Sequence, residues 1–271
     1  MKYSMMSYTW SRQPQHFDLL KMLQQVRELD MAGVDFVTLH DRSAKELRAL
    51  AGDCGVPVVC HTFFADVSQP DGDARTKALD AARRGIEAAV VLGAPTVMVV
   101  TPGKAGVPRN RQRRDWIAGL QRVQPFAAAA GVALTVENFP GADSPFVVAD
   151  DVLEAMRDVP GLRLTFDAGN AASGEDPVES FHRSAPFVVH AHFKDWTVRP
   201  DAAPGFRPML DGRHYKSALI GEGVVDHRAC LAAMAAAGYP GCINIEYEGN
   251  DYPPAEAVRR AVTYLRGIEP A

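Results

Sequence analysis

Short apolar runs alternate along the chain with longer segments in which apolar residues recur at spacings of three and four. The short runs are rich in β-branched residues and are typical of buried strands, whereas the spacing in the longer segments is typical of amphipathic helices. Strands are predicted at 2–8, 34–40, 56–62, 95–101, 132–138, 162–167, 187–193 and 241–247. Helices are predicted at 18–32, 43–53, 73–92, 111–130, 149–158, 176–184, 226–237 and 254–267.

The order of these elements predicts an α/β fold. Strands that alternate with helices pair in parallel through right-handed crossovers, and eight such units close most naturally into a (β/α)8 TIM barrel. A doubly wound open sheet is the alternative, but no GxGxxG or GxxxxGK[ST] phosphate loop follows the first strand. We therefore expect residues 1–271 to form a single barrel domain, in which 196–223 is a lid or rim loop.

Composition and charge narrow the classes of function. The 271 residues are 47% hydrophobic and carry a formal net charge of −4, so no excess of positive charge attracts nucleic acid or anionic lipid. We find neither a signal-peptide pattern nor an apolar run long enough to span a membrane. The chain has four cysteines and no CxxC pair, so we expect its cysteines to be reduced, buried thiols. The sequence therefore predicts a cytoplasmic protein with no nucleic-acid or membrane partner.

Polar residues stand where the predicted strands end, which in a barrel is the active face. These residues are His40, Asp41, His61, Glu137, Asn138, Asp167, His192 and Glu246. Taken singly, such a residue is usually a turn former or a helix cap. Four consecutive strands that each end in this way instead predict a functional site.

Side chains alternate along a strand, so each candidate can be assigned to a face. Glu137 shares its face with Thr135, and Glu246 shares its face with Asn244 and Glu248. These polar neighbours indicate the barrel interior. His190 and His192 also share a face, and we expect His192 to be the functional histidine because it is nearer the carboxyl end.

The last four strands together supply three carboxylates and one imidazole. Such an oxygen-rich donor set suits Mn²⁺, Mg²⁺ or Co²⁺ better than structural zinc. Without a cation, the carboxylates would repel one another and raise at least one pKa. The alternative is that these acids form salt bridges with Lys194 and Arg163. The predicted metal ligands are Glu137, Asp167, His192 and Glu246.

Several motifs resemble the xylose-isomerase-like sugar isomerase/epimerase family, which includes tagatose-type 3-epimerases, inosose dehydratases and hydroxypyruvate isomerases and is related to endonuclease IV. They are VEN at 136–138, TFDAGN at 165–170, HAHFKDW at 190–196, GEGVVD at 221–226 and GYPGCINIEYEG at 238–249. The resemblance implies a barrel with one divalent metal ion held by the same four residues. Mn²⁺ is the first choice, with Mg²⁺, Co²⁺ and Zn²⁺ as alternatives.

The resemblance also suggests substrate contacts. Lys194, in an HxKD pattern, and His61 are expected to contact substrate, with a salt-bridged lysine and a core histidine as the alternatives. Many epimerases of the family have a histidine that touches substrate three residues after the metal aspartate. Asn170 stands at that position in this chain and is also expected to contact substrate. These epimerases also carry an arginine beyond the metal histidine, and here Arg199 follows at a different spacing. Independently of the resemblance, Trp10 lies near a predicted strand end and is expected to form part of a sugar pocket, with a place in the core or an interface as the alternative.

The expected reaction is proton transfer on a keto-sugar or ketocyclitol. Glu137 and Glu246 would flank the substrate as catalytic residues, one removing a proton to form a metal-stabilised enediolate and the other returning a proton. Return to the opposite face gives epimerisation, return to the next carbon gives isomerisation, and loss of a β-hydroxyl gives dehydration. The expected partner is a small sugar or cyclitol, and a homodimer or homotetramer is left open.

Two other classes of function, a nuclease and a sugar-binding protein, are alternatives to this enzyme. A metal-dependent nuclease would use more histidines than the eight present and a basic surface. The arginines that could form such a surface follow the fourth predicted strand. They could reach the rim and bind a substrate phosphate, but a solvated helix start or a subunit contact is the simpler interpretation. A sugar-binding protein would not need paired carboxylates at a metal. The arginine cluster consists of Arg109, Arg111, Arg113 and Arg114.

Overall fold

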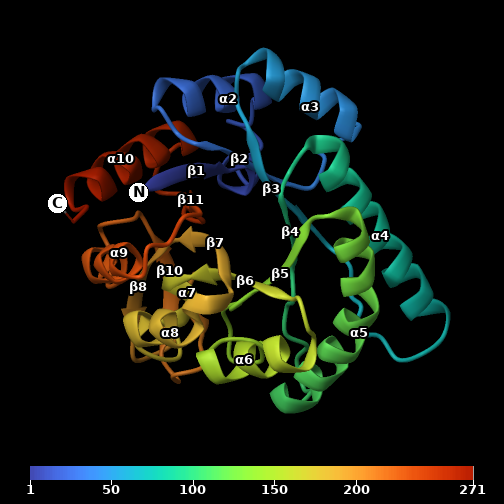
Figure 1. Ribbon diagram of the computed structural model, residues 1–271. Coiled ribbons are helices and arrows are strands. Elements are labelled where there is room, and N and C mark those ends of the chain that lie inside the picture. The colour runs from blue at the N-terminus through green and yellow to red at the C-terminus, as the bar shows by residue number, and fades with distance from the viewer. Residues whose placement is uncertain (271) are drawn as a thin grey trace.

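A computed structural model describes residues 1–270 of the chain and shows a closed barrel of parallel strands (Figure 1). Around the barrel the strands follow the order β1-β11-β7-β6-β5-β4-β3-β2. The predicted (β/α)8 TIM barrel is confirmed. The strands are β1 (Lys2–Met6), β2 (Gly33–Val37), β3 (Val58–Phe63), β4 (Thr96–Val99), β5 (Ala133–Glu137), β6 (Arg163–Asp167), β7 (Val188–Phe193) and β11 (Cys242–Ile245).

Helices surround the barrel (Figure 1). They are α2 (Leu19–Glu28), α3 (Ala44–Asp53), α4 (Asp73–Leu92), α5 (Arg109–Ala130), α6 (Ala149–Asp158), α8 (Pro177–Ser184), α9 (His227–Ala236) and α10 (Pro254–Gly267). Two shorter helices, α1 (Ser7–Ser11) and α7 (Ala168–Ala171), follow strands directly, and a 3-10 turn, η1, spans Ala185–Phe187. The first predicted strand therefore ends early, because the chain turns into α1 at Ser7. Among residues 1–270, no helix is both long and apolar enough to cross a membrane.

The strands present different residues to the two sides of the barrel wall. On β5, Leu134 and Val136 are fully buried in the main apolar core between barrel and helices. Thr135 lies on the other face and its hydroxyl is 2.8 Å from that of Thr165. The barrel interior is therefore polar at this level, as the alternation predicts. Glu137 extends from the same face at the carboxyl end of the strand.

Two of the clustered arginines join helices. Arg113 Nη1 lies 2.5 Å from Asp151 Oδ1, and its Nε lies 2.5 Å from Glu154 Oε2. Arg109 also pairs with Asp151. Both arginines belong to α5 and both acids belong to α6, so the expected solvated helix start is wrong for these two side chains. They bridge adjacent helices because the acidic face of α6 lies opposite.

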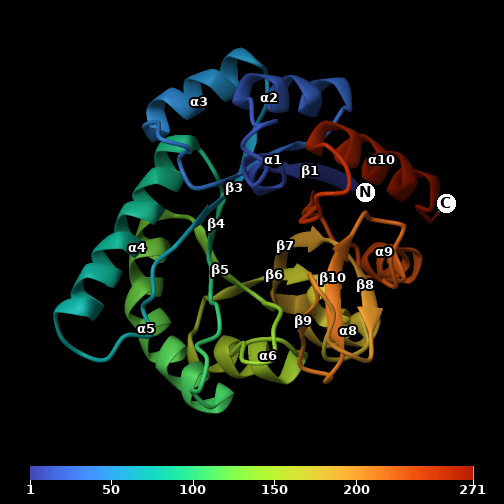
Figure 2. The ribbon, with the colours of Figure 1, turned by 180° about the vertical axis from the view of Figure 1, so that it is seen from behind.

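The segment after β7, which is expected to be an irregular lid or rim loop, forms a small antiparallel sheet, so the prediction that it is irregular is wrong (Figure 2). Its strands are β8 (Asp195–Arg199), β9 (Arg207–Pro208) and β10 (His214–Ala218), in the order β8-β10-β9. Trp196 and Tyr215 are almost fully buried, with ring centroids 6.0 Å apart. This aromatic pair gives the insertion a core of its own, which an irregular loop would lack.

A single carboxylate fastens both ends of the insertion. Asp195, fully buried, accepts hydrogen bonds from the backbone N–H groups of Trp196, Gly221, Gly223 and Val225. A Cβ atom at position 223 would collide with the Asp195 carboxylate. The glycine is therefore needed for this close approach, which explains part of the GEGVVD motif.

Candidate active site

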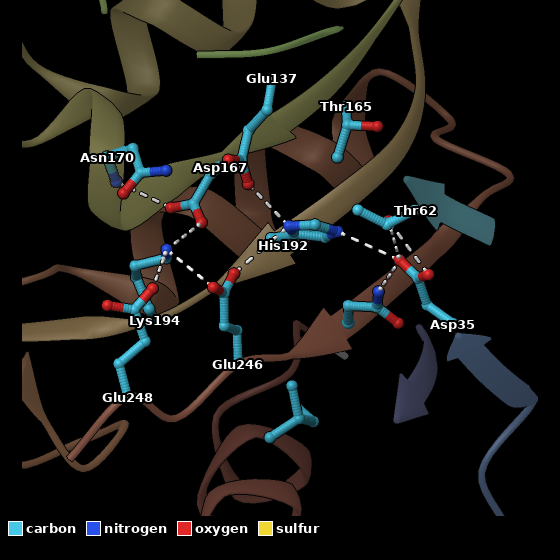
Figure 3. A network of polar contacts seen from close by, with 12 residues as sticks. Asp35, Thr62, Glu137, Thr165, Asp167, Asn170, His192, Lys194, Glu246 and Glu248 are labelled. Carbon is cyan, nitrogen blue, oxygen red and sulfur yellow. Dashed lines mark hydrogen bonds and ion pairs between the residues drawn. The ribbon is translucent and has the colours of Figure 1, made fainter. Parts of the chain in front are cut away.

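Four side chains from the second half of the barrel converge at the carboxyl ends of their strands (Figure 3). Each offers one potential ligand atom, and these atoms all lie within 4.8 Å of one another. All four residues are buried. The structure thus brings together the residues predicted as metal ligands, which we call the four-ligand cluster: Glu137, Asp167, His192 and Glu246.

The donor atoms of this cluster fit a divalent cation. His192 Nδ1 lies 2.7 Å from Glu137 Oε1 and 3.3 Å from Glu246 Oε2. Within residues 1–270, Asp167 Oδ2 and Glu246 Oε2 are buried without a hydrogen-bond donor. Buried carboxylate oxygens in that condition are costly unless a cation or another donor satisfies them. The chemistry of the donor set and these free oxygens both suit a bound metal ion.

Lys194 lies among the acids with its side chain 2% exposed. Its Nζ is 3.0 Å from Glu246 Oε1, 3.1 Å from Glu248 Oε1 and 3.4 Å from Asp167 Oδ2. The salt-bridge alternative is therefore realised for Lys194, whereas Arg163 is exposed at the start of β6. One lysine thus faces three carboxylates, so Lys194 alone cannot neutralise all of them.

This crowding changes the proton affinities of the cluster. Burial, together with the nearby charges of Glu137 and Glu246, raises the pKa of Asp167 to about 8 despite the opposing effect of Lys194. Burial alone would lower the pKa of Lys194, but the surrounding carboxylates raise it well above its usual range. Lys194 therefore stays charged, and the acids compete for one cation.

The TFDAGN and HAHFKDW motifs pack against each other through a glycine. A Cβ atom at Gly169 would lie 2.5 Å from Lys194 Cγ and 2.7 Å from the Lys194 carbonyl oxygen. The Gly169 carbonyl oxygen also accepts a 2.8 Å hydrogen bond from Trp196 Nε1. The absence of a side chain at this position allows α7 to approach β7, which places Lys194 beside Asp167.

A cavity of about 180 Å³, which we call the site hollow, adjoins the cluster. Its charged lining comes from the second half of the chain: Glu137, Arg207, Glu246 and Glu248. Its apolar lining comes mainly from β1 to β4 and the segments that follow them: Met6, Tyr8, Val37, Phe64, Met98 and Val100. A second cavity of about 490 Å³ lies against the insertion and shares Arg207 and Glu248 with the site hollow.

The arginine at the site hollow is Arg207, which sequence reasoning missed. Its guanidinium carbon lies 5.2 Å from the Trp196 ring centroid and its Nη2 lies 3.5 Å from Glu248 Oε2. Arg199, the arginine considered from sequence, ends β8 with its guanidinium carbon 5.7 Å from the Phe206 ring centroid. Arg207 could have been found only by recognising that 196–223 folds back as a sheet.

Three predicted substrate contacts have different surroundings. Asn170 is fully buried beside Asp167, and neither polar atom of its side chain has a hydrogen-bond partner in the described part of the chain. His61 does not reach the cluster: its Nδ1 lies 2.9 Å from the Phe36 carbonyl oxygen, and it lines a separate cavity. Trp10 is 4% exposed and packs in the main core. Tyr8, two residues earlier, lines the site hollow instead.

Comparison with known proteins gives relatives and a family. Inosose dehydratase from Lacticaseibacillus casei is 30% identical over 155 residues, 54% of this chain and about half (51%) of that relative's length. The rhizopine catabolism protein MocC from Rhizobium meliloti is 27% identical over 250 residues, 85% of this chain and 74% of the relative. D-psicose 3-epimerase from Clostridium cellulolyticum H10, solved with D-tagatose, superposes with a TM-score of 0.78 at 14% identity and covers 100% of both chains. Residues 23–268 match the family described as the xylose isomerase-like TIM barrel, and the chain therefore belongs to that family.

Proposed function

We propose that the chain is a divalent-metal-dependent enzyme that removes a proton next to the carbonyl of a keto-sugar or ketocyclitol and then isomerises, epimerises or dehydrates it. One observation carries this proposal: Glu137 and Glu246 line the same small cavity and share a ligand cluster with Asp167 and His192. The names of the relatives, an inosose dehydratase and a D-psicose 3-epimerase, support the same class of substrate.

The four-ligand cluster is the proposed metal site, with Mn²⁺ as the expected ion and Mg²⁺, Co²⁺ or Zn²⁺ as alternatives. A bound divalent ion would supply Lewis-acid stabilisation of negative charge on substrate oxygens. The three buried carboxylates of the cluster, and the oxygens of Asp167 and Glu246 that lack a hydrogen bond among residues 1–270, support this assignment. Lys194 reduces the repulsion among the acids and holds Glu246 and Glu248 in place.

The two glutamates reach the site hollow from well-separated directions. In the barrel, β5 and β11 are separated by β6 and β7. The carboxylate of one glutamate takes the proton from the carbon next to the ketone, the C–H electron pair forms a carbon–carbon double bond, and the negative charge passes to the ketone oxygen. The other glutamate begins the cycle protonated, so that it can return a proton from another side.

The destination of the returned proton decides the product. Delivery to the opposite face of the same carbon epimerises it. Delivery to the former ketone carbon, with transfer of the hydroxyl proton on the deprotonated carbon to the former ketone oxygen, moves the carbonyl to that carbon and isomerises the sugar. Delivery to a β-hydroxyl releases water and makes the enzyme a dehydratase, which the match to inosose dehydratase specifically favours.

Asn170 is the additional substrate contact in this proposal. Its buried amide lacks partners among residues 1–270, so a substrate hydroxyl could satisfy both the donor and the acceptor. Lys194 has a different role from the one expected from sequence, because its ammonium group already forms ion pairs with three carboxylates. We therefore assign Lys194 to positioning the acids. His61 and Trp10 are not part of the proposed site.

The test is a panel of ketoses and ketocyclitols incubated in deuterated water with the Mn²⁺-loaded protein, with product and label followed by NMR and mass spectrometry. Turnover with deuterium at the carbon next to the carbonyl is expected. Glu137→Gln and Glu246→Gln should each lower turnover by about 10² or more, the scale for losing a general acid or base. Thr165→Val, an interior change outside the cluster, is the control.

The two glutamine variants should also differ from each other. The variant that lacks the abstracting base should not exchange the substrate proton with solvent, whereas the other variant should still exchange it. Turnover without any solvent label would replace this mechanism with a hydride shift or with proton transfer that is fully shielded from solvent, and intramolecular transfer from a specifically labelled substrate would decide between them. The absence of both turnover and proton exchange with every member of the panel would contradict the proposal.

A further inference from the structure

From the polar layer beneath the four-ligand cluster, we infer that Asp35 is a positioning residue that fixes the His192 ring for metal binding; this rests on the metal site of the proposed function. Asp35 lies within β2 and is fully buried. It is on the opposite side of the His192 ring from the other three ligands of the cluster (Figure 3). Its Oδ2 is 3.6 Å from His192 Nε2. The imidazole thus lies between Asp35 on one side and Glu137 on the other.

The two ring nitrogens of His192 face different partners. Nδ1 faces Glu137 and Glu246, the direction in which a cation would be held. Nε2 faces Asp35 and has no hydrogen-bond partner within the described residues. A neutral histidine that gives one nitrogen to a metal carries its proton on the other nitrogen. Asp35 is the acceptor toward which that buried N–H group points.

Asp35 is itself held in place. The Thr62 hydroxyl lies 3.2 Å and 3.3 Å from its two carboxylate oxygens, and Asn244 Nδ2 donates to Oδ2 at 2.9 Å. The Ser4 hydroxyl in turn donates to Asn244 Oδ1. All of these groups are fully buried. A carboxylate fixed by several donors in a dry interior is suited to fix the orientation of the histidine that it faces.

A second cation site is the competing interpretation of the same residues. Asp35, Cys60 and His190 offer ligand atoms that lie within 4.8 Å of one another. However, Thr62 and Asn244 already direct donors at the Asp35 oxygens, and these donors would compete with a cation. The donor pattern therefore favours support of His192 over binding of a second ion.

The test measures Mn²⁺ binding to the metal-free protein by isothermal titration calorimetry. Wild type should bind one ion per chain, and Asp35→Asn should weaken binding by about 10- to 100-fold, the usual effect of losing such a supporting carboxylate. Thr62→Val removes one donor to Asp35 and should cause a smaller loss in the same direction. Thr165→Val, a matched threonine in the barrel interior without a hydrogen bond to Asp35 or His192 among residues 1–270, should bind as wild type does.

A second readout separates ring orientation from simple loss of charge. In ¹⁵N NMR of the Mg²⁺-loaded protein, His192 should carry its proton on Nε2 in wild type and show a mixture of tautomers in Asp35→Asn. Glu248→Gln also removes one negative charge near the cluster, but Glu248 faces Lys194 and not His192. This variant should keep the Nε2–H tautomer whatever its affinity for the metal.

The outcomes separate this inference from the metal site itself. A wild-type protein that binds no divalent ion would contradict the proposed function. Wild-type binding with equal affinity in Asp35→Asn, or with an unchanged tautomer, would overturn the role of Asp35 alone. Two bound ions per chain, one of them lost in Cys60→Ser, would establish the second cation site instead. If circular dichroism shows that Asp35→Asn does not fold, Thr62→Val decides, and wild-type affinity in that variant overturns the inference.

Discussion

The two halves of the barrel contribute different chemistry to the same cavity. The half built from β1 to β4 lines the site hollow with apolar side chains such as Met98 and Val100, whereas the half built from β5 to β11 supplies the charged wall with Glu137 and Glu246. The strand–helix repeat is the same in both halves, so the fold does not create this difference. The residues at the strand ends do. An apolar wall opposite a charged one keeps water away and strengthens the electrostatic interactions between them.

Below the cavity, the first half of the barrel also contributes polar residues. Asp35 and Thr62 come from β2 and β3 and lie beneath the cluster, facing His192 from behind. The contrast between the halves therefore applies to the lining of the cavity, while the supporting layer extends across the barrel. Variants that change one wall at a time can measure how far the charged and apolar walls act separately.

Removal of the metal should have the largest effect, because it leaves the charged wall without its cation. Treatment with a chelator should abolish turnover of the substrate identified in the ketose and ketocyclitol panel. Mn²⁺ or Co²⁺ should restore activity better than Zn²⁺, since the cluster is rich in carboxylate oxygens. Activity assays after dialysis and metal addition check this. Full activity in the chelated protein, or a clear preference for Zn²⁺, would count against the assignment.

Loss of one predicted ligand should weaken the metal site without removing the cavity. Asp167→Ala and His192→Ala should each lower Mn²⁺ affinity by well over tenfold, because each change removes a donor atom from the cluster. Metal analysis and calorimetry measure this loss. His182→Ala, at an exposed position on α8, is the matched control and should keep wild-type affinity. Equal Mn²⁺ occupancy in the wild type and all of these variants would contradict the assignment of the four-ligand cluster as the metal site.

A methyl group at Gly169 should disturb the charged wall indirectly. Gly169→Ala places a carbon against Lys194 and should lower the free energy of unfolding by about 1 to 3 kcal/mol, the usual cost of overpacking. Turnover should fall as well, because Lys194 would move away from Glu246. Denaturant unfolding and activity assays measure both effects. Gly52→Ala, in α3 with open space around the new carbon, should leave both unchanged or add slight stability.

The smallest effect is expected at the apolar wall. Phe64 lines the site hollow but is 59% exposed, so Phe64→Ala should cost little folding stability. Loss of its contact with substrate should raise KM about fivefold, equivalent to about 1 kcal/mol, with kcat nearly unchanged. Leu20→Ala, another exposed apolar position, is the control on α2 and should change neither constant. A fall in kcat as large as that of the glutamate variants would erase the contrast between the walls.

The regular part of the fold could be predicted from sequence because its two periodicities are strong. Helices such as α4 end at left-handed glycines, and the strands of the second half alternate clearly between polar and apolar residues. The four-ligand cluster follows from the same alternation, since strand ends in a parallel barrel meet at one face. Glu248 could be assigned to the interior face for the same reason, as it lies two residues after Glu246.

The missed features have physical causes. The place of His61 near a strand end predicts that it reaches the active face. However, Thr62, one residue later, is on the inward face of β3, and a shift of one residue reverses the direction of a side chain. Asp35 lies inside an apolar run, where sequence alone does not show its partners. Strands β8 to β10 are short and antiparallel, so they break the repeat on which the rest of the prediction depends.

The fastening at Asp195 has a consequence for how such a protein can diversify. Because one buried carboxylate closes both ends of the insertion, the segment between Trp196 and Gly221 is a module with a fixed junction. Closing a longer module at that junction would cost little, since each doubling of loop length adds only about 0.6 kcal/mol. Replacement sheets or loops could therefore be grafted there to change what reaches Arg207 and the larger cavity, while the barrel beneath stays the same.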